Sequence, residues 1–195
     1  MDTKKLVQTA MFTALVLLAT MVFKIQTPVL GYIHLGDAFV LLSAVILGPL
    51  SGGAAAGLGS ALADLLGGYA VWCPGTLVIK FLTAFTAAHI YHGIDRFYSK
   101  EKYHPSRMIL ASVSGEIVMV IGYFIFNILI VIFSGGEISE TAFSNAVTVS
   151  VAEVPFNIIQ AVSGIIIASL LCPVFEGIMN KIKNLIDLFY PSKIL

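Results

Sequence analysis

Long apolar runs are the feature that most constrains this chain. Four of them are about as long as the roughly 20 residues that cross the hydrocarbon core of a bilayer as a helix. A fifth run, 36–67, is interrupted at Gly48-Pro49 and by the glycines that follow, which divides it into two shorter helices. The sequence therefore predicts an all-α integral membrane bundle in one domain, 1–195. Its six spans are expected at about 4–25, 36–49, 51–67, 75–98, 107–134 and 148–172.

The composition supports a membrane protein. Only 11% of the residues are charged, 58% are hydrophobic, and the mean hydropathy is +0.95. A soluble domain carries roughly 25% charged residues, so this chain cannot cover a water-facing surface. The charges of the 11 basic and 11 acidic residues cancel, so the chain has no net positive charge to attract nucleic acid. Two cysteines, Cys73 and Cys172, are too few and too far apart for a disulfide framework or zinc cluster, and no metal site is expected.

The basic residues predict the orientation. Most of them fall on one side of a six-span bundle, and only Lys24 and Lys80 do not. The members of the larger group are Lys4, Lys5, Arg96, Lys100, Lys102, Arg107, Lys181, Lys183 and Lys193. The opposite hairpin, around Glu137 and Glu140, has no Lys or Arg. By the positive-inside rule both termini are expected to be cytoplasmic. We expect the protein in a plasma membrane of the prokaryotic type.

The segment 174–190 differs from the spans. Apolar residues such as Phe175, Ile178 and Ile182 alternate with Lys181 and Lys183 at helical spacing. This pattern predicts a C-terminal amphipathic helix lying at the cytoplasmic interface. The alternative is a plain continuation of the last span.

Polar residues inside the spans indicate a pocket. A charge in mid-bilayer costs roughly 2.5–3.5 kcal/mol on insertion scales, so it usually faces a cavity or a partner. Helical spacing aligns two polar stripes, and the outer loops add aromatic and polar groups, including Tyr69. The candidate substrate-binding residues are Tyr32, His34, Asp37, Asp64, Trp72, Lys80, Glu116, Tyr123, Asn127, Glu153, Asn157 and Gln160. They predict a pocket open to the outside.

Each group of candidates also has a purely structural interpretation. Asp64, Lys80 and an acidic neighbour could neutralise one another as an ion pair. Tyr69 and Trp72 could belong to an interfacial aromatic belt. The amides of the two stripes could be interhelical hydrogen-bond partners.

Motifs that are missing point to a partner protein. The chain has no phosphate-binding loop and none of the common hydrolase or redox motifs, so it cannot itself bind ATP in the usual way. Ala10 and Ala14 form a small-xxx-small pair, which is the better candidate for contact with another protein. Similar pairs between Gly48 and Gly59 are expected to pack within the bundle.

Several motifs occur along the chain in a fixed order: Ala10-x-x-x-Ala14, 31–38 (GYIHLGDA), 47–49 (LGP), 57–65 (GLGSALADL), 74–80 (PGTLVIK) and Glu153-x-x-x-Asn157-x-x-Gln160. On these motifs the chain resembles a substrate-binding S component of an energy-coupling factor (ECF) vitamin transporter. It most resembles the branch for riboflavin, hydroxymethylpyrimidine and pyridoxine.

The resemblance implies a six-helix bundle that binds its vitamin near the outer face. It also implies docking through Ala10 and Ala14 onto a membrane T component that carries two cytoplasmic ATPases. The chain would then need no cofactor of its own, since the partners bind ATP. It would deliver the vitamin by toppling within the membrane.

The pocket residues suggest the substrate class. Stacking on Trp72 or Tyr123, with Asn127, Asn157 and Gln160 reading ring heteroatoms, suits pyridoxine or hydroxymethylpyrimidine. Riboflavin is the alternative within the same class. An enzyme is not expected, although a small intramembrane enzyme using Glu116 and Glu153 as acid and base is an alternative of another class. A structural membrane subunit without any ligand is a third hypothesis.

Overall fold

The computed structural model describes residues 3–94, 104–135 and 139–189, and at 180 and 182–189 it describes the backbone alone. Within these ranges the chain forms six helices and one short β-hairpin. The elements are α1 (Thr3–Val22), β1 (Lys24–Gln26), β2 (Tyr32–His34), α2 (Gly36–Leu47), α3 (Pro49–Leu66), α4 (Cys73–Gly93), α5 (Pro105–Gly135) and α6 (Glu140–Phe189). The helical bundle predicted from the sequence is confirmed.

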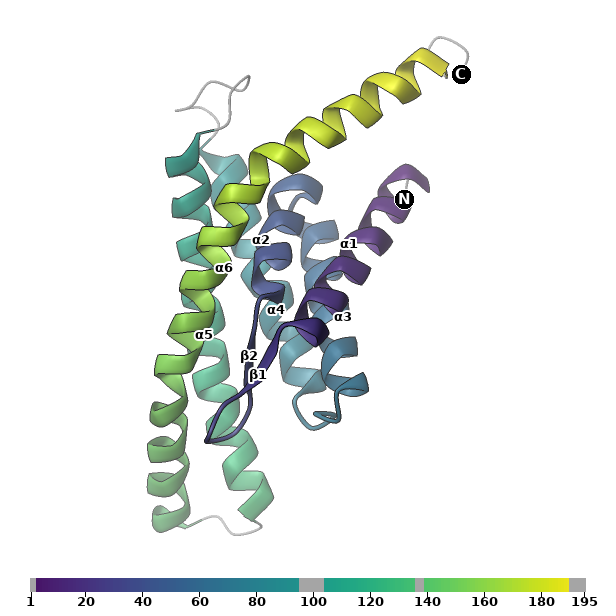
Figure 1. The fold of residues 1–195 in the computed structure, drawn as a ribbon. Helices are drawn as coiled ribbons and strands as arrows, with labels where there is room; N and C mark the ends of the chain where they lie inside the picture. Colours follow the sequence, from purple (N-terminus) through teal and green to yellow (C-terminus); the bar gives the residue numbers. More distant parts are fainter. Residues whose placement is uncertain (1–2, 95–103, 136–138, 190–195) are drawn as a thin grey trace.

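The path of the chain matches six passes through a bundle. The helices run up and down alongside one another, and the start of α1 and the end of α6 lie at the same end of the molecule (Figure 1). At the opposite end the hairpin of α5 and α6 extends beyond the other helices (Figure 1). The basic residues Arg96, Lys100, Lys102 and Lys193, and Glu137 at the other end, lie outside the described residues.

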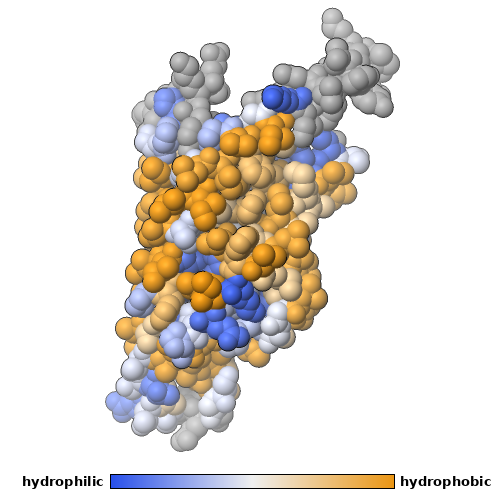
Figure 2. All heavy atoms as spheres, in the orientation of Figure 1, coloured by the Kyte–Doolittle hydropathy of each residue, from blue (hydrophilic) through white to orange (hydrophobic). Residues whose placement is uncertain are grey.

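Four of the helices, α1, α4, α5 and α6, are long and apolar enough to cross a membrane. Large apolar side chains on their outer surfaces are exposed, among them Ile121, Ile166 and Leu170. Figure 2 shows that apolar atoms dominate the body of the bundle, apart from a hydrophilic patch in the region of the hairpin. This surface is suited to lipid, as the sequence predicted.

The hairpin is the feature that the sequence did not predict. β1 and β2 pair antiparallel, with Lys24 opposite His34 and Gln26 opposite Tyr32. The following helix, α2, has only 12 residues and spans about 18 Å, less than the hydrocarbon thickness of about 30 Å. The hairpin therefore lies beside the bundle at a depth where a longer helix would otherwise continue. Non-helical backbone is tolerated there only where it lines a cavity or is buried in protein.

Small residues bring the first three helices close together. Gly48 joins α2 to α3 with φ 79°, a left-handed conformation that favours glycine, and Pro49 starts α3. A side chain on Gly59 would lie 2.6 Å from the backbone oxygen of Thr13 in α1. The glycine pairs therefore serve packing within the bundle, as expected. Ala10 and Ala14 are exposed on the outer face of α1.

The last helix differs from the prediction in two ways. It begins at Glu140 rather than near 148, because the Ser139 side chain accepts a hydrogen bond from the Ala142 backbone N–H (3.1 Å) and caps the first turn. It then continues through Pro155 and Pro173 to Phe189, so 174–189 is the last part of α6 and is not separated from the last span by a break. Figure 1 shows the final part of α6 bending away from the bundle. Its place at the membrane interface stays a prediction.

Candidate functional site

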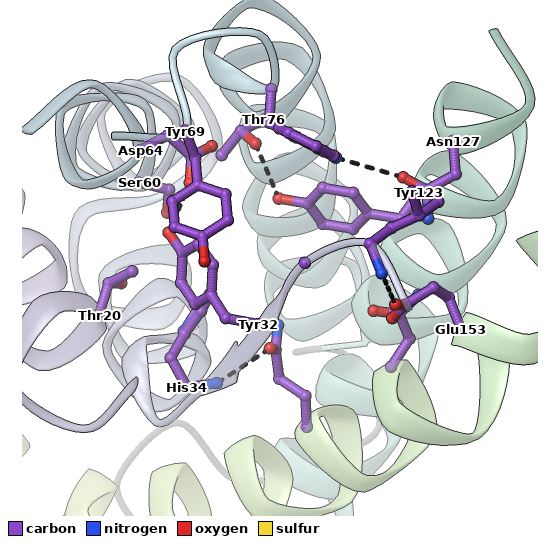
Figure 3. Close-up of a pocket in the computed structure, with 15 residues that line it drawn as sticks. Thr20, Tyr32, His34, Ser60, Asp64, Tyr69, Thr76, Tyr123, Asn127 and Glu153 are labelled. Carbon is purple, nitrogen blue, oxygen red and sulfur yellow. Dashed lines mark hydrogen bonds between the residues drawn. The ribbon is translucent and has the colours of Figure 1, made fainter. Parts of the chain in front are cut away.

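A cavity of about 50 Å³ lies between the β-hairpin and the helices in the half of the bundle away from the chain ends. Six elements contribute to its wall. The lining residues are Thr20, Leu30, Gly31, Tyr32, His34, Ser60, Asp64, Tyr69, Trp72, Thr76, Tyr123, Asn127, Glu153, Asn157 and Gln160 (Figure 3). The end of α3, the start of α4 and the α5–α6 pair meet here because the chain reverses direction at each connection.

Aromatic rings form one part of the wall. The ring centroids of Tyr32 and Tyr69 are 4.8 Å apart, and those of Tyr69 and Trp72 are 5.8 Å apart. The Lys24 ammonium lies 4.1 Å from the centroid of the Tyr32 ring and 4.0 Å from that of Tyr69, a cation–π arrangement. On the other side, the Tyr123 hydroxyl donates to Thr76 Oγ1 at 3.1 Å. These rings offer flat faces to an aromatic ligand.

Hydroxyl and carboxylate oxygens form the second part. The Tyr32 hydroxyl donates to Asp64 Oδ1. In the part of the chain that the structure describes, Asp64 Oδ2, Ser60 Oγ and Thr20 Oγ1 are buried without any hydrogen-bond partner. Figure 3 places Thr20, Ser60 and Asp64 on the same side of the cavity. Buried polar atoms normally have partners, so these three can accept or exchange hydrogen bonds with a ligand that carries hydroxyl or N–H groups.

Glu153 fastens the hairpin to α6. One carboxylate oxygen accepts hydrogen bonds from the Thr27 hydroxyl (2.7 Å) and the Leu30 backbone N–H (2.6 Å). The Thr27 hydroxyl in turn accepts from the Gly31 N–H at 3.0 Å. Glu153 therefore holds the tip of the hairpin over the cavity, while Asn157 and Gln160 continue the same face of α6.

His34 ends the hairpin in a neutral form. Its backbone N–H donates to Gln160 Oε1 (3.1 Å), and its ring Nδ1 accepts from the Gly36 N–H (3.0 Å). Burial lowers the pKa of the His34 imidazole to about 4. A neutral ring that accepts at Nδ1 carries its proton on Nε2. The ring therefore helps to fix the connection between β2 and α2.

Asp37 and Lys80 lie behind the cavity wall. They form an ion pair with both side chains fully buried, and the Gln160 amide also donates to Asp37 Oδ2 at 2.7 Å. The sequence left open whether Asp64 pairs with Lys80. The structure pairs Lys80 with Asp37 from α2, whereas Asp64 bonds to Tyr32.

Nine of the twelve candidate residues meet at one cavity. Asp37, Lys80 and Glu116 do not line it, although all three are buried inside the bundle, on α2, α4 and α5 respectively. Sequence reasoning missed Thr20, Ser60 and Thr76. Ser60 lies one turn before Asp64 and Thr76 one turn before Lys80, so the spacing of polar residues along α3 and α4 could have indicated both.

The described side chains offer no cluster of metal ligands. Among the described residues, no group of three or more His, Cys, Asp and Glu side chains could hold a metal ion. Glu116 does not line the cavity that Glu153 lines, so these two residues do not form the acid–base pair of the enzyme hypothesis.

Comparisons with known proteins agree with the geometry. The family model described as ECF-type riboflavin transporter, S component, matches residues 1–176. A protein of Pyrococcus woesei described as an uncharacterised protein in the gap 3′ region is 39% identical over 153 residues, which is 78% of this chain and 88% of that protein. A solved S component of a bacterial ECF transporter superposes with a TM-score of 0.59 at 21% identity, over 94% of this chain and 99% of that one.

Proposed function

Because this chain belongs to the family of ECF-type riboflavin transporter S components, we propose that it captures a small hydroxylated heteroaromatic vitamin from outside the cell. It is a multi-pass cell-membrane protein and a subunit of a transporter, not an enzyme. The observation that carries the proposal is the cavity, whose wall combines aromatic rings with oxygens of Thr20, Ser60 and Asp64 that have no partner among the described residues.

A single-ring vitamin, pyridoxine or hydroxymethylpyrimidine, is our first candidate. The cavity of about 50 Å³ is far smaller than the roughly 300–1,000 Å³ of pockets for drug-sized ligands. A small ring between Tyr32, Tyr69 and Tyr123 requires the least movement of the hairpin. Its hydroxyl groups would bond to Ser60 and Asp64, and Asn127 and Asn157 would read its ring heteroatoms.

Riboflavin is the second candidate. The description of the matching family favours it, since that description names riboflavin transporters. A three-ring ligand would need the hairpin tip to move away from Glu153, because Leu30 and Gly31 close the cavity on that side.

Delivery of the vitamin needs partners. We assign the contact with a membrane T component to the exposed face of α1 around Ala10 and Ala14, where no side chain beyond a methyl group separates the backbones of two packed helices. ATPase subunits attached to the T component would bind and hydrolyse the ATP. The bundle would topple in the membrane to present the cavity to the cytoplasm. Its apolar flanks would keep the free-energy cost of this rotation in lipid low.

Binding measurements with purified protein test the substrate. Calorimetric titration with pyridoxine, hydroxymethylpyrimidine and riboflavin is expected to give saturable heat with one of the single-ring vitamins. Ser60→Ala and Thr20→Val each remove one hydrogen bond and should weaken binding about 10-fold. Ser114→Ala is the matched control, since its hydroxyl bonds to the Leu110 carbonyl on the exposed side of α5.

Two results would contradict the assignment. Tighter binding of riboflavin than of either single-ring vitamin would replace the first candidate by the second. Unchanged affinity in both Ser60→Ala and Thr20→Val would remove the cavity as the binding site.

A further inference from the structure

A layer of buried polar side chains crosses the centre of the bundle behind the cavity. It consists of Asp37 from α2, Lys80 from α4, Glu116 from α5 and Gln160 from α6, and we call it the central layer. Asp37 and Lys80 are fully buried, Glu116 is 2% exposed and Gln160 is 3% exposed. Gln160 connects the layer to the cavity, because its amide donates to Asp37 while its carbonyl accepts from the His34 backbone.

Glu116 is the member of the central layer without a partner. Within the described residues, neither of its carboxyl oxygens has a hydrogen-bond partner, although both are buried. Ser112, one turn earlier on α5, is also buried without a partner and gives Glu116 no bond. The charged groups whose electrostatic influence reaches Glu116 are Asp37 and Lys80.

The buried polar side chains described on the two neighbouring helices α4 and α6 at this level have hydrogen-bond partners other than Glu116. Lys80 on α4 donates to Asp37, and the Thr83 hydroxyl donates to the Ile79 carbonyl at 2.8 Å. Gln160 on α6 is used by Asp37 and His34. On α5 itself, the Tyr123 hydroxyl donates to Thr76. In the structure, therefore, no described side chain donates a hydrogen bond to Glu116.

We propose that Glu116 is a proton-binding site, and that its side chain is the reserve counter-ion of Lys80. A buried carboxylate without donors is very costly, whereas the protonated carboxyl is neutral and is tolerated. The layer then carries one positive and one negative charge. Asp37 takes the ionised role because it has two donors, Lys80 and Gln160, and Glu116 has neither.

The proposal predicts a transfer of roles when Asp37 is neutralised. In Asp37→Asn, Lys80 loses its counter-ion, and Glu116 is then the acidic side chain that remains in the central layer. Glu116 then releases its proton and pairs with Lys80, so the layer stays neutral overall. This inference concerns the protonation of the bundle and does not depend on which vitamin the cavity binds.

Infrared spectroscopy of the full chain in lipid nanodiscs tests the proton directly. The difference spectrum between the natural protein and Glu116→Gln is expected to contain the C=O band of a protonated carboxyl group. The same band should be missing from Asp37→Asn, with an ionised carboxylate band in its place. Glu140→Gln, at the exposed start of α6, is the matched control and should leave the protonated band unchanged. A carboxylate band for Glu116 in the natural protein, whether free or bound to a metal ion, would overturn the proposal.

Thermal unfolding tests the reserve role. Glu116→Gln should unfold near the temperature of the natural protein, and Asp37→Asn should lose only a few degrees. The double variant leaves Lys80 buried without a counter-ion, so its midpoint should lie roughly 10 °C below the sum of the single effects. Additive single effects would contradict the proposal, and so would an Asp37→Asn protein that fails to fold while Glu116 is present.

Discussion

At the scale of single residues, His34 has to remain uncharged for the hairpin to keep its place. The imidazole is buried, and its Nδ1 accepts a hydrogen bond from the Gly36 N–H at 3.0 Å. A proton on Nδ1 would break this bond and place a cation beside Lys80 and Lys24, with only Asp37 to offset it. The neutral ring is therefore part of the folded structure.

This requirement predicts a loss of stability in acid. The pKa of His34 falls from its ordinary value of 6.5 to about 4 on burial, so between these values the unfolded chain binds more protons than the folded one. The contribution is fully present above pH 6.5 and is lost as the pH falls toward 4, by up to about 3 kcal/mol. Unfolding midpoints measured from pH 8 to pH 4 should show this fall.

The control for this prediction is His34→Asn. The Asn carbonyl can accept the Gly36 N–H but does not titrate, so the midpoint of this variant should change much less between pH 6.5 and pH 4. An equally steep fall in the variant would show that other groups cause the loss.

The oxygens that line the cavity differ in whether they already have a hydrogen-bond partner, and this difference decides which of them can bind a ligand. Glu153 is committed to the hairpin through Thr27 and Leu30, whereas Ser60 and Thr20 have no partner among the described residues. Glu153 is therefore a positioning residue in the structure without ligand. The hydroxyl groups are the free hydrogen-bonding groups.

At the scale of elements, the hairpin replaces the outer part of a helix. Strands of three residues expose backbone groups that a helix would satisfy internally, and His34 N–H finds its acceptor in the Gln160 side chain. The exchange makes room for the cavity, because a helix at this position would fill the space with its own side chains.

The exposed face of α1 carries the prediction for assembly. Ala10 and Ala14 lie one turn apart on the outside, with Met11 and Leu18 exposed nearby. Ala10→Leu and Ala14→Leu would keep the partner helix at a greater distance, so capture of the T component and ATPases should fall about 10-fold. Co-purification of the complex measures this, with vitamin affinity expected to be unchanged.

Leu18→Met is the matched control for these variants, since it keeps the volume of an exposed residue on the same helix. Complex yields that are the same for the alanine variants and the control would rule out this face as the docking surface.

At the scale of the whole molecule, the arrangement of the passes predicts the orientation. The start of α1 and the end of α6 lie at one end, and the α5–α6 hairpin extends at the other (Figure 1). The positive-inside rule makes the first end cytoplasmic. In a Cys73→Ser background, Ser144→Cys should react with an impermeant maleimide on intact cells, and Thr3→Cys should react only after permeabilisation. The reverse pattern would show that the orientation, and with it the outward cavity, is wrong.

The sequence by itself determined the helices, the bundle and most of the cavity wall. Apolar runs of membrane length and the Gly48-Pro49 break are local patterns, and local patterns report helices directly. The stripe of Glu153, Asn157 and Gln160 follows from the helical repeat alone, and these three residues do share one cavity. The resemblance to ECF S components rested on motifs of the same local kind.

Only the tertiary structure decided which polar groups meet. Lys80 pairs with Asp37, which lies 43 residues away in the sequence, and Gln160 reaches Asp37 across 123 residues. The helical repeat relates only residues within one helix, so it cannot predict pairs with such sequence separations. The hairpin depends in the same way on Glu153, which holds its tip from another helix. A buried charge selects its partner by the packing of helices around it, and that packing is a property of the whole bundle.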